Sequence, residues 1–460
     1  METLVCQLEE AASTQPQYEA LRRPKATLPE MVMAAWRLSL AVGVLVLQIA
    51  IQRRAQMPTW WPVCPICGKR LRSKGFADRR VLTLLGWVLW KRPVGRCPDR
   101  CEIGHVVAPL DEELGIGPGE HTSAEVKHTA CAMAVFLPFE LTARFLAQLT
   151  GVHVGHSAVW EWVQEAGRRA MKRLDRELKA LAQGATPQPE ALSPMLAGLP
   201  LVCGADGVMV PFRSQVGTPE GKVTWREVKV GIFARLGHRL TQKGKQVVQL
   251  HRRRLLAVLG KPKDLQVRLR LEGLRQGMSN ARLVSSVSDG SRWLWPIVSP
   301  VFAGVRRLRR VLDFYHAAQN IWKGVEPYFG RKKDKALAYF RLARHLLRQG
   351  EADVVLADIL RAAQEPGLPA GAKKSLERLY RYLKRYRGCI DYGNTKAMGL
   401  PIGSGMVESA CKWLIQQRFK CVGMRWSEEG FNHLLHLRLA WVNGRFDDLF
   451  FRPGCVPLPQ

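Results

Sequence analysis

The second half of the chain alternates between β-prone and helical segments in an order that limits the folds available to it. In chain order, the predicted elements are strands at Leu199–Phe212, Val223–Ala234 and Gln246–Leu250, a helix within Leu255–Met278 after a turn at Gly260-Lys-Pro262, a strand at Arg282–Ser288, a helix over Trp293–Gly304 and a short strand at Arg310–Phe314. This order is β-β-β-α-β-α-β. A long helical stretch then separates it from a final helix that begins at Ser404.

An RNase-H-like domain has the same order of elements. Its strands form a mixed sheet in which the first strand is central and the fourth lies beside it. The chain is therefore predicted to be α/β in this domain, and α+β overall.

Three acidic residues fall on elements that this fold brings together. Asp206 lies on the first strand, Asp289 ends the fourth strand, and Glu408 lies near the start of the final helix. Phosphoryl transfer on nucleic acids uses two divalent cations about 4 Å apart, held by carboxylates from different elements. We therefore predict that these three acids are catalytic and bind two Mg²⁺ (or Mn²⁺) ions.

Each acid also has a structural interpretation. Asp-Gly pairs, as at Asp206 and Asp289, are common in turns, and an acid in the first turn of a helix is favoured by the helix dipole. Asp313, at the tip of the fifth strand, is an alternative second metal ligand. We assign Asp313 and the nearby His316 a supporting role because the end of the fourth strand adjoins the first strand.

Two close cysteine pairs flank a short hairpin-like segment. Cys64 and Cys67 form the first pair, and Cys97 and Cys101 form the second, which has three intervening residues rather than two. Four thiolates in this arrangement suit a closed, structural Zn²⁺ site of the zinc-ribbon type. Free buried cysteines are the alternative, and His105 is close enough in sequence to replace one ligand.

The charge of the chain indicates a polyanionic partner. Lys and Arg total 70 against 39 Asp and Glu, which gives a formal net charge of +31. Because the basic residues are spread along the chain, they suit a large footprint on double-stranded DNA. A basic but unspecific surface and a membrane surface are the alternatives.

The N-terminal region shows no export pattern. Residues 1–57 are predicted to be helical, and the apolar run Leu38–Ile51 is too short to cross a bilayer, so we interpret it as a buried helix. We expect no membrane association and a cytoplasmic, nucleoid-associated protein. Its 11 cysteines would then stay reduced unless they bind metal.

A helical pair precedes the predicted sheet. Leu141–Gly167 has the pattern of a helix, a turn at Leu149-Thr-Gly151 and a second helix with Ser157 as its N-cap. This spacing is typical of a helix-turn-helix, whose second helix enters a major groove. Short helical pairs are also common in proteins that do not touch DNA.

The final helix and the residues after it offer a basic surface. A buried stripe at Val407, Ala410, Cys411 and Leu414 leaves the opposite face for phosphate contacts. Core packing is the alternative for Trp426. The predicted DNA-binding residues are Lys412, Gln416, Arg418, Lys420, Arg425 and Trp426.

These motifs together resemble those of bacterial insertion-sequence DDE transposases, particularly the ISKra-type family. The resemblance covers roughly residues 60–440. The motifs that carry it are the two cysteine pairs, Gly204-Ala-Asp206-Gly, Ser288-Asp289-Gly, Leu312-Asp-Phe-Tyr-His316, Pro401-Ile-Gly-Ser-Gly-Met-Val-Glu408-Ser-Ala, Gln416-Gln-Arg418-Phe-Lys420 and Gly423-Met-Arg-Trp426.

The resemblance implies excision and insertion of a mobile element by magnesium-dependent hydrolysis and transesterification. It also implies a helical insertion between the fifth strand and the glutamate helix, and a homodimer or larger assembly on DNA. Related families place an aspartate or cysteine three residues before a histidine after their second catalytic acid. Asp313 and His316 match this pattern, which favours Asp289 as the metal ligand.

Two other functions remain open from the sequence. One is a catalytically retired transposase that acts as a sequence-specific DNA-binding regulator, and the other is a structure-selective RNase-H-like nuclease that cuts without joining. The predicted domain order is a helical N-terminal region (1–57), a zinc-ribbon-like domain (58–115), a helix-turn-helix-like domain (116–182), a linker (183–198), the first part of the catalytic core (199–316), a helical insertion (317–400), the core's glutamate helix and end (401–445) and a C-terminal tail (446–460).

Overall fold

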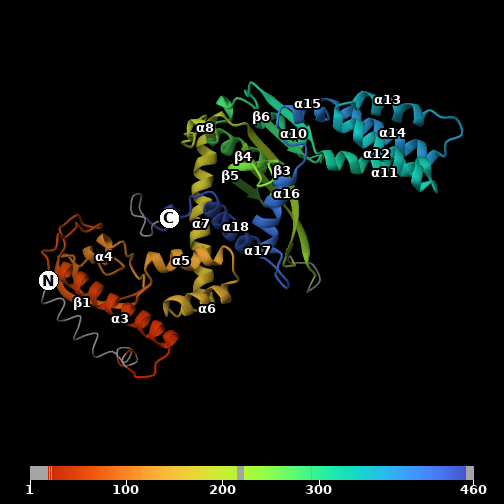
Figure 1. Cartoon of the computed structure of the whole chain (residues 1–460). Helices are drawn as coiled ribbons and strands as arrows, with labels where there is room; N and C mark the ends of the chain where they lie inside the picture. Colours follow the sequence, from red (N-terminus) through yellow and green to blue (C-terminus); the bar gives the residue numbers. More distant parts are fainter. Residues whose placement is uncertain (1–18, 20, 22, 215–221, 292, 452–460) are drawn as a thin grey trace. The chain divides into compact units, whose positions relative to one another are not determined.

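The computed structural model describes residues 19, 21, 23–214, 222–291 and 293–451 (Figure 1). The chain divides into two compact units, Met1–Ala166 with Asp447–Gln460, and Gly167–Phe446. The predictions for residues 1–18 and for 452–460 fall outside the described residues.

The first unit combines a long helix, an antiparallel hairpin and a group of shorter helices. Its hairpin strands pair from Arg72 opposite Arg96 to Thr83 opposite Gly86. The elements are α3 (Leu28–Ala55), β1 (Arg72–Thr83), β2 (Gly86–Arg96), α4 (Pro109–Glu113), α5 (Ala124–Ala134), α6 (Phe139–Thr150) and the start of α7 (His156–Ala182).

Helix α3 packs on the hairpin along one stripe only. Val44, Leu47, Ile51 and Ala55 contribute to the core cluster that includes Val81, Val88 and Trp90 of the hairpin. Their spacing of three or four residues places them on one helical face.

The apolar run Leu38–Ile51 lies in a helix, as predicted, but the predictions that it is buried and too short to cross a bilayer were wrong. The helix is 28 residues long, and only 11% of its most apolar window is buried. Met33 and Trp36 on its free side are 45% and 49% exposed. By length and composition alone, α3 is long and apolar enough to cross a membrane. Signal sequences and the core helices of soluble proteins meet the same two criteria.

The helical pair is present, with a different second cap. Helix α6 ends at Gly151, whose φ of 73° closes the helix in the left-handed conformation that glycine adopts without strain. Helix α7 begins at His156, so Ser157 lies inside it, and the carbonyl of Gly155 accepts the first helical bond from Val159. Helix α7 then continues for 27 residues.

The second unit is built on one mixed sheet. Among the described residues it has five strands in the order β5-β4-β3-β6-β7. The first predicted strand is therefore central and the fourth lies beside it, as expected. The strands are β3 (Leu201–Phe212), β4 (Thr224–Leu240), β5 (Gln246–Val258), β6 (Val284–Ser288) and β7 (Leu308–Leu312).

Strand β5 is much longer than predicted. The sequence analysis ended this strand at Leu250, but Leu255 to Val258 also pair with β4. The helix α9 begins at Pro262, at the predicted turn Gly260-Lys-Pro262. The run Leu255-Leu-Ala-Val258 is buried on both faces of the sheet, so it lacks the alternation that marks a half-exposed strand.

Helices cover both faces of the sheet. On one face, Leu201 and Cys203 of β3 pack against α9 (Pro262–Arg275) and α10 (Trp295–Val301). On the other face, Val202 packs with Leu400 and Met406, which lie before and within α16 (Gly405–Ala410). Figure 1 shows α16 beside β3.

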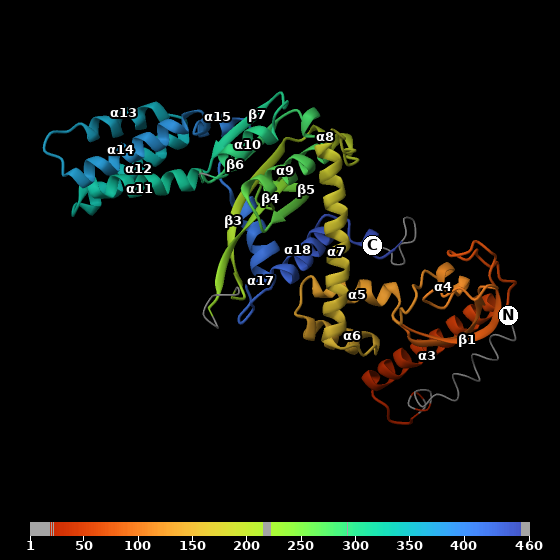
Figure 2. The ribbon, with the colours of Figure 1, turned by 180° about the vertical axis from the view of Figure 1, so that it is seen from behind.

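A helical insertion lies between β7 and α16, and its helices form one apolar core with the ends of β6 and β7. Figure 2 shows α11 to α14 packed side by side beyond the β7 edge of the sheet. The remaining helices are α8 (Pro194–Gly198), α11 (Phe314–Phe329), α12 (Lys333–Gln349), α13 (Ala352–Ala363), α14 (Ala370–Arg385), α15 (Tyr392–Ala397), α17 (Gln417–Phe419) and α18 (Glu428–Val442).

The segment predicted as a linker, 183–198, is fastened to the sheet. The amide of Glu190 donates to the carbonyl of Arg275 at 2.7 Å. Its carboxylate accepts a bidentate pair of bonds from Arg254, from Nε to Oε1 and from Nη2 to Oε2, and a further bond from Arg445 at 2.8 Å. The segment is therefore an ordered part of the second unit and includes α8.

Candidate active site and candidate zinc centre

Three aspartates lie at the same level on three neighbouring strands. Gly204 of β3 pairs with Val287 of β6, which in turn pairs with Val311 of β7, and all three strands are parallel to one another. Two residues further along each strand direction come Asp206, Asp289 and Asp313. Because side chains alternate between faces, a shift of two residues keeps all three on the face of Gly204.

That face is the one covered by the glutamate helix. A side chain at Gly204 would meet Val407 of α16, since a Cβ there would lie 3.2 Å from Val407 Cβ. Glycine therefore lets α16 approach β3 closely at Val407, the residue before Glu408. The predicted acids Asp206, Asp289 and Glu408 thus come from β3, the end of β6 and α16, around a single face of the sheet.

The pKa of Asp206 is affected by its burial and by the neighbouring acids Asp289 and Glu408. Burial raises the pKa of Asp206, and the charges of Asp289 and Glu408 raise it further. The Gly207 amide, which donates to Asp206 Oδ1 at 2.7 Å, and the charge of His316 oppose that rise in the pKa. Like charges held together in a partly buried place are stabilised by a bound cation.

Asp206, Asp289 and Glu408 are not part of a compact ligand cluster among the described residues. Within the described ranges, the cysteine group discussed below is the group whose ligand atoms all lie within 4.8 Å of one another. A pair of cations about 4 Å apart spans a larger set of ligands than one cation does. Carboxylates are the side chains that hard divalent cations prefer as ligands.

Both carboxylate oxygens of Asp313 accept hydrogen bonds from backbone amides. Its side chain is fully buried and caps α11 by accepting from the amide of His316 at 2.8 Å. Its other oxygen accepts a short hydrogen bond from the amide of Ser404. Asp313 therefore has fewer free lone pairs for a metal than Asp289, whose Oδ1 accepts from Ser291 and which is partly exposed.

Glu408 is exposed and is held near the start of its helix by Ser404. The Ser404 hydroxyl lies 3.1 Å from Glu408 Oε1. Ser404 was predicted only as the start of a helix, and its contacts with Asp313 and Glu408 were not predicted. The Gly403-Ser-Gly405 stretch is its only signal in the sequence.

The helix after Glu408 widens into a π-helix over Cys411–Gln416. The buried side chain of Arg438 donates to the carbonyls of Trp413 at 2.6 Å and Leu414 at 2.9 Å within this turn. Arg438 thus supplies donors to carbonyls that the wider turn shifts from their usual partners.

The predicted DNA-binding residues differ in how exposed their side chains are. Lys412, Gln416, Lys420 and Arg425 are exposed, as expected for phosphate contacts. Arg418 is only 1% exposed, so the expectation that it faces DNA was wrong.

Arg418 and Trp426 instead form part of the interior. The guanidinium of Arg418 lies 5.4 Å from the ring centre of Trp426, and burial lowers the pKa of Arg418 to about 10. Trp426 packs on Phe419 and donates through Nε1 to the Phe419 carbonyl at 3.0 Å. Core packing, the alternative interpretation of Trp426, is the one that its contacts support.

The four predicted cysteines come together in the first unit. The Sγ atoms of Cys64, Cys67, Cys97 and Cys101 all lie within 4.8 Å of one another, and this group can bind zinc. His105 is exposed and lies outside the group.

Tight backbone turns position the two cysteine pairs. After the first pair, Gly68 has a φ of 72° and donates to the Cys64 carbonyl at 2.9 Å. Burial raises the pKa of Cys97, but backbone amides of Cys101 and Asp99 outweigh it and lower the pKa to about 7. Lys69 and Asp99 join the two turns through an ion pair of 2.9 Å.

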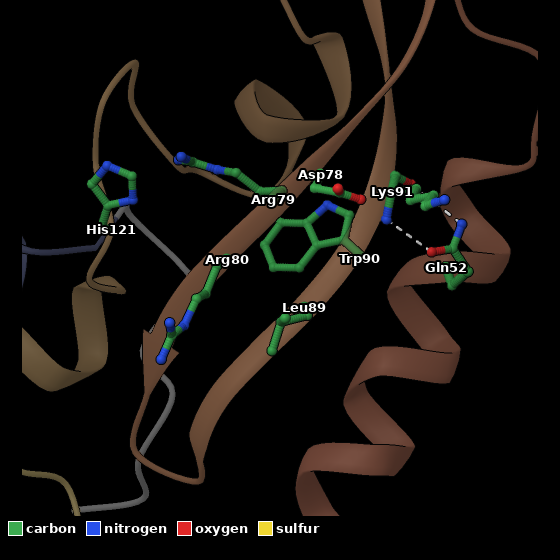
Figure 3. A pocket seen from close by; sticks show the side chains of 8 residues that line it. All are labelled: Gln52, Asp78, Arg79, Arg80, Leu89, Trp90, Lys91 and His121. Atoms are coloured by element: carbon green, nitrogen blue, oxygen red, sulfur yellow. Dashed lines mark hydrogen bonds between the residues drawn. The ribbon is translucent and has the colours of Figure 1, made fainter.

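A cavity of the first unit, of about 540 Å³, lies between the end of α3 and the hairpin (Figure 3). Gln52 of α3 makes two hydrogen bonds to the backbone of Lys91, at 2.9 and 3.2 Å. The buried indole nitrogen of Trp90 has no hydrogen-bond partner among the described residues. Figure 3 shows this nitrogen on the side of Asp78, but the open lining points to no particular ligand chemistry.

Comparisons with known proteins give a distant structural similarity and no sequence match. No model of a known protein family matches the sequence, and no curated protein matches it. The structure is similar to a chain of the Drosophila P element transposase strand transfer complex, with a TM-score of 0.32 and 10% sequence identity over 70% of this chain and 93% of that chain. A TM-score at this level does not establish a shared fold.

Proposed function

We propose that this chain is a DDE transposase with an RNase-H-like core, which cuts DNA at the ends of a mobile element and joins them to target DNA. In this proposal Asp206, Asp289 and Glu408 bind two Mg²⁺ (or Mn²⁺) ions. Asp313 and His316 position the site, and the four cysteines hold a structural Zn²⁺. The family is the ISKra type, and the active assembly on DNA is a homodimer or larger.

One observation carries the proposal. Asp206 and Asp289 are at the same level on neighbouring parallel strands, on the face that the Glu408 helix covers. Hydrolysis and transesterification at phosphorus need carboxylates from separate elements around two cations, and this face supplies them. The net charge of +31 supports a DNA substrate.

The test uses linear DNA that carries the inverted repeats flanking the coding sequence, with a supercoiled plasmid as target. The parent protein should nick the repeat ends and form joined product with Mg²⁺ or Mn²⁺ and none with Ca²⁺. Asp206→Asn should abolish both products and leave DNA binding intact. The matched control, Asp334→Asn, removes an exposed aspartate at the start of α12 and should behave as the parent.

The products separate the proposed function from its two competitors. Nicking without joined product indicates a nuclease of the same fold. Binding to the repeats without any metal-dependent product indicates a DNA-binding regulator. Unchanged cutting by Asp206→Asn would show that the catalytic acids lie elsewhere.

A further inference from the structure

A basic cavity lies in the insertion, directly beside the loop that carries Asp289. It has a volume of about 640 Å³ and is lined by α11, α14 and Gly290. The two helices approach closely because Gly324 of α11 has no side chain, and a Cβ there would lie 2.6 Å from Leu379 of α14. We call this space the α11–α14 cavity.

Four cations line the α11–α14 cavity. Arg378, Arg381 and Arg385 follow one another at three and four residues on α14, so they share one helical face, and Lys323 lies opposite on α11. In the described part of the chain none of the four makes an ion pair with an acid within 4 Å. Uncompensated positive charge in a concave surface attracts an anion more strongly than the same charge on a flat surface.

The inner end of the cavity touches the Asp289 loop through two tyrosines. The hydroxyl of Tyr386 donates to the carbonyl of Gly290 at 3.1 Å. The hydroxyl of Tyr382 is buried and has no hydrogen-bond partner among the described residues, and burial raises its pKa. A Cβ at Gly290 would lie 3.1 Å from that hydroxyl, so the Tyr382 donor lies next to the residue that follows Asp289.

We propose that the α11–α14 cavity binds the phosphate backbone of the nucleic-acid strand that leads away from the cutting site. The three arginines and Lys323 would contact successive phosphates, and Tyr382 would donate to the phosphate nearest Asp289. Arginine suits this role because its planar guanidinium forms paired bonds with phosphate oxygens. The inference rests on the proposed function, because it takes the Asp289 loop as part of the cutting site.

Binding, rather than cutting, tests this inference. The full-length chain is used with Asp206→Asn and without divalent cations, so a failure of the proposed catalysis leaves the measurement unaffected. Fluorescence anisotropy with labelled single-stranded and double-stranded 30-mers gives the affinity at several salt concentrations. The cavity variant is Arg378→Ala/Arg381→Ala/Arg385→Ala.

The same helix offers a matched control. Lys373→Ala/Lys374→Ala/Lys384→Ala removes three exposed cations of α14 that do not line the cavity. The cavity variant should bind about tenfold or more weakly near physiological salt, and its logarithmic salt dependence should fall by about two to three. The control should lose less than about threefold. The triple lysine variant at the three arginine positions keeps the charge without the paired bonds and should recover part of the affinity, which excludes misfolding as the cause.

Three outcomes would overturn the inference. Equal losses in the two triple variants would show that general charge, and not the cavity, holds the strand. An unchanged affinity in the cavity variant would show that DNA does not occupy it. A rise in melting temperature with inorganic phosphate that the cavity variant lacks, together with unchanged DNA affinity, would assign the cavity to a small free anion.

Discussion

The buried carboxylate of Asp313 accepts a hydrogen bond from the backbone amide of Ser404, 91 positions further along the chain. The same carboxylate caps α11 through the amide of His316. Ser404 in turn contacts Glu408 through its hydroxyl. One aspartate therefore fixes both ends of the insertion to the end of β7, and the position of the proposed catalytic glutamate depends on it.

Replacing Asp313 should cost stability, whereas replacing Asp289 should cost activity. Asp313→Ala removes a helix cap and leaves a buried amide without its acceptor, so we expect a loss of about 2–4 kcal/mol in the free energy of unfolding. Asp289→Ala, on a partly exposed loop, should lose less than about 1 kcal/mol but all DNA cutting. Urea unfolding and the nicking assay measure the two effects. A comparable loss of stability in both variants would contradict the separate roles.

The cysteine group should hold zinc. We expect about one zinc ion per chain by elemental analysis of the purified parent protein. Cys64→Ser should lose the metal and lower the melting temperature of the first unit, since a structural zinc site contributes directly to folding. Cys421→Ser, which changes an exposed cysteine outside the group, is the control and should keep the metal. Metal-free parent protein that is equally stable would point to free thiols instead.

The ion pairs of Glu190 should make stability depend on acid pH. Burial would raise the pKa of Glu190, but Arg254 and Arg445 outweigh it and lower the pKa to about 2 from an ordinary value of 4.5. Because the folded pKa is the lower one, this stabilisation is complete above pH 4.5 and is lost as the pH falls towards 2.

The difference in unfolding free energy between the parent and Glu190→Gln should therefore be constant from pH 7 to pH 5 and shrink below pH 4.5. Urea unfolding at a series of pH values measures it, with the exposed Glu377→Gln as control. A difference that stays constant down to pH 3 would show that the two arginines do not hold the ionised carboxylate.

Arg418 and Lys420 should respond differently to truncation, although they are two positions apart. Arg418→Ala opens space beside Trp426 and Met424 and should lower the free energy of unfolding by about 2 kcal/mol or more. Arg418→Met should recover part of that loss because it refills the space. Lys420→Ala, at an exposed position, should leave stability unchanged and weaken DNA binding. The reverse pattern would place Arg418, and not Lys420, on the DNA.

The order of strands and the positions of Asp206, Asp289 and Glu408 could be predicted because each rests on a local pattern. Strand β3 is a run of buried apolar residues, and Glu408 follows a Gly-Ser-Gly helix start. The pairing of the strands then follows from the order of elements. The cysteine group was predictable for the same reason, since its spacing is local.

The features that could not be predicted depend on contacts between distant residues. The π-helix after Glu408 lies against Arg438, 24 and 25 positions away from the carbonyls it bonds. Arg418 is basic in the sequence but buried by a turn that brings Trp426 back over it. Glu190 lies in a stretch with the composition of a linker, and only Arg254 and Arg445 make it part of the core.

The insertion also sets the order in which a newly made chain acquires its parts. Asp206, Asp289 and Asp313 leave the ribosome before Ser404 and Glu408, and the whole helical insertion is synthesised in between. A growing or truncated polypeptide that stops before Ser404 carries the aspartates of the sheet without the acid from the last helix. Since domains fold as units during synthesis, the helical insertion must be made before the proposed cutting centre is complete.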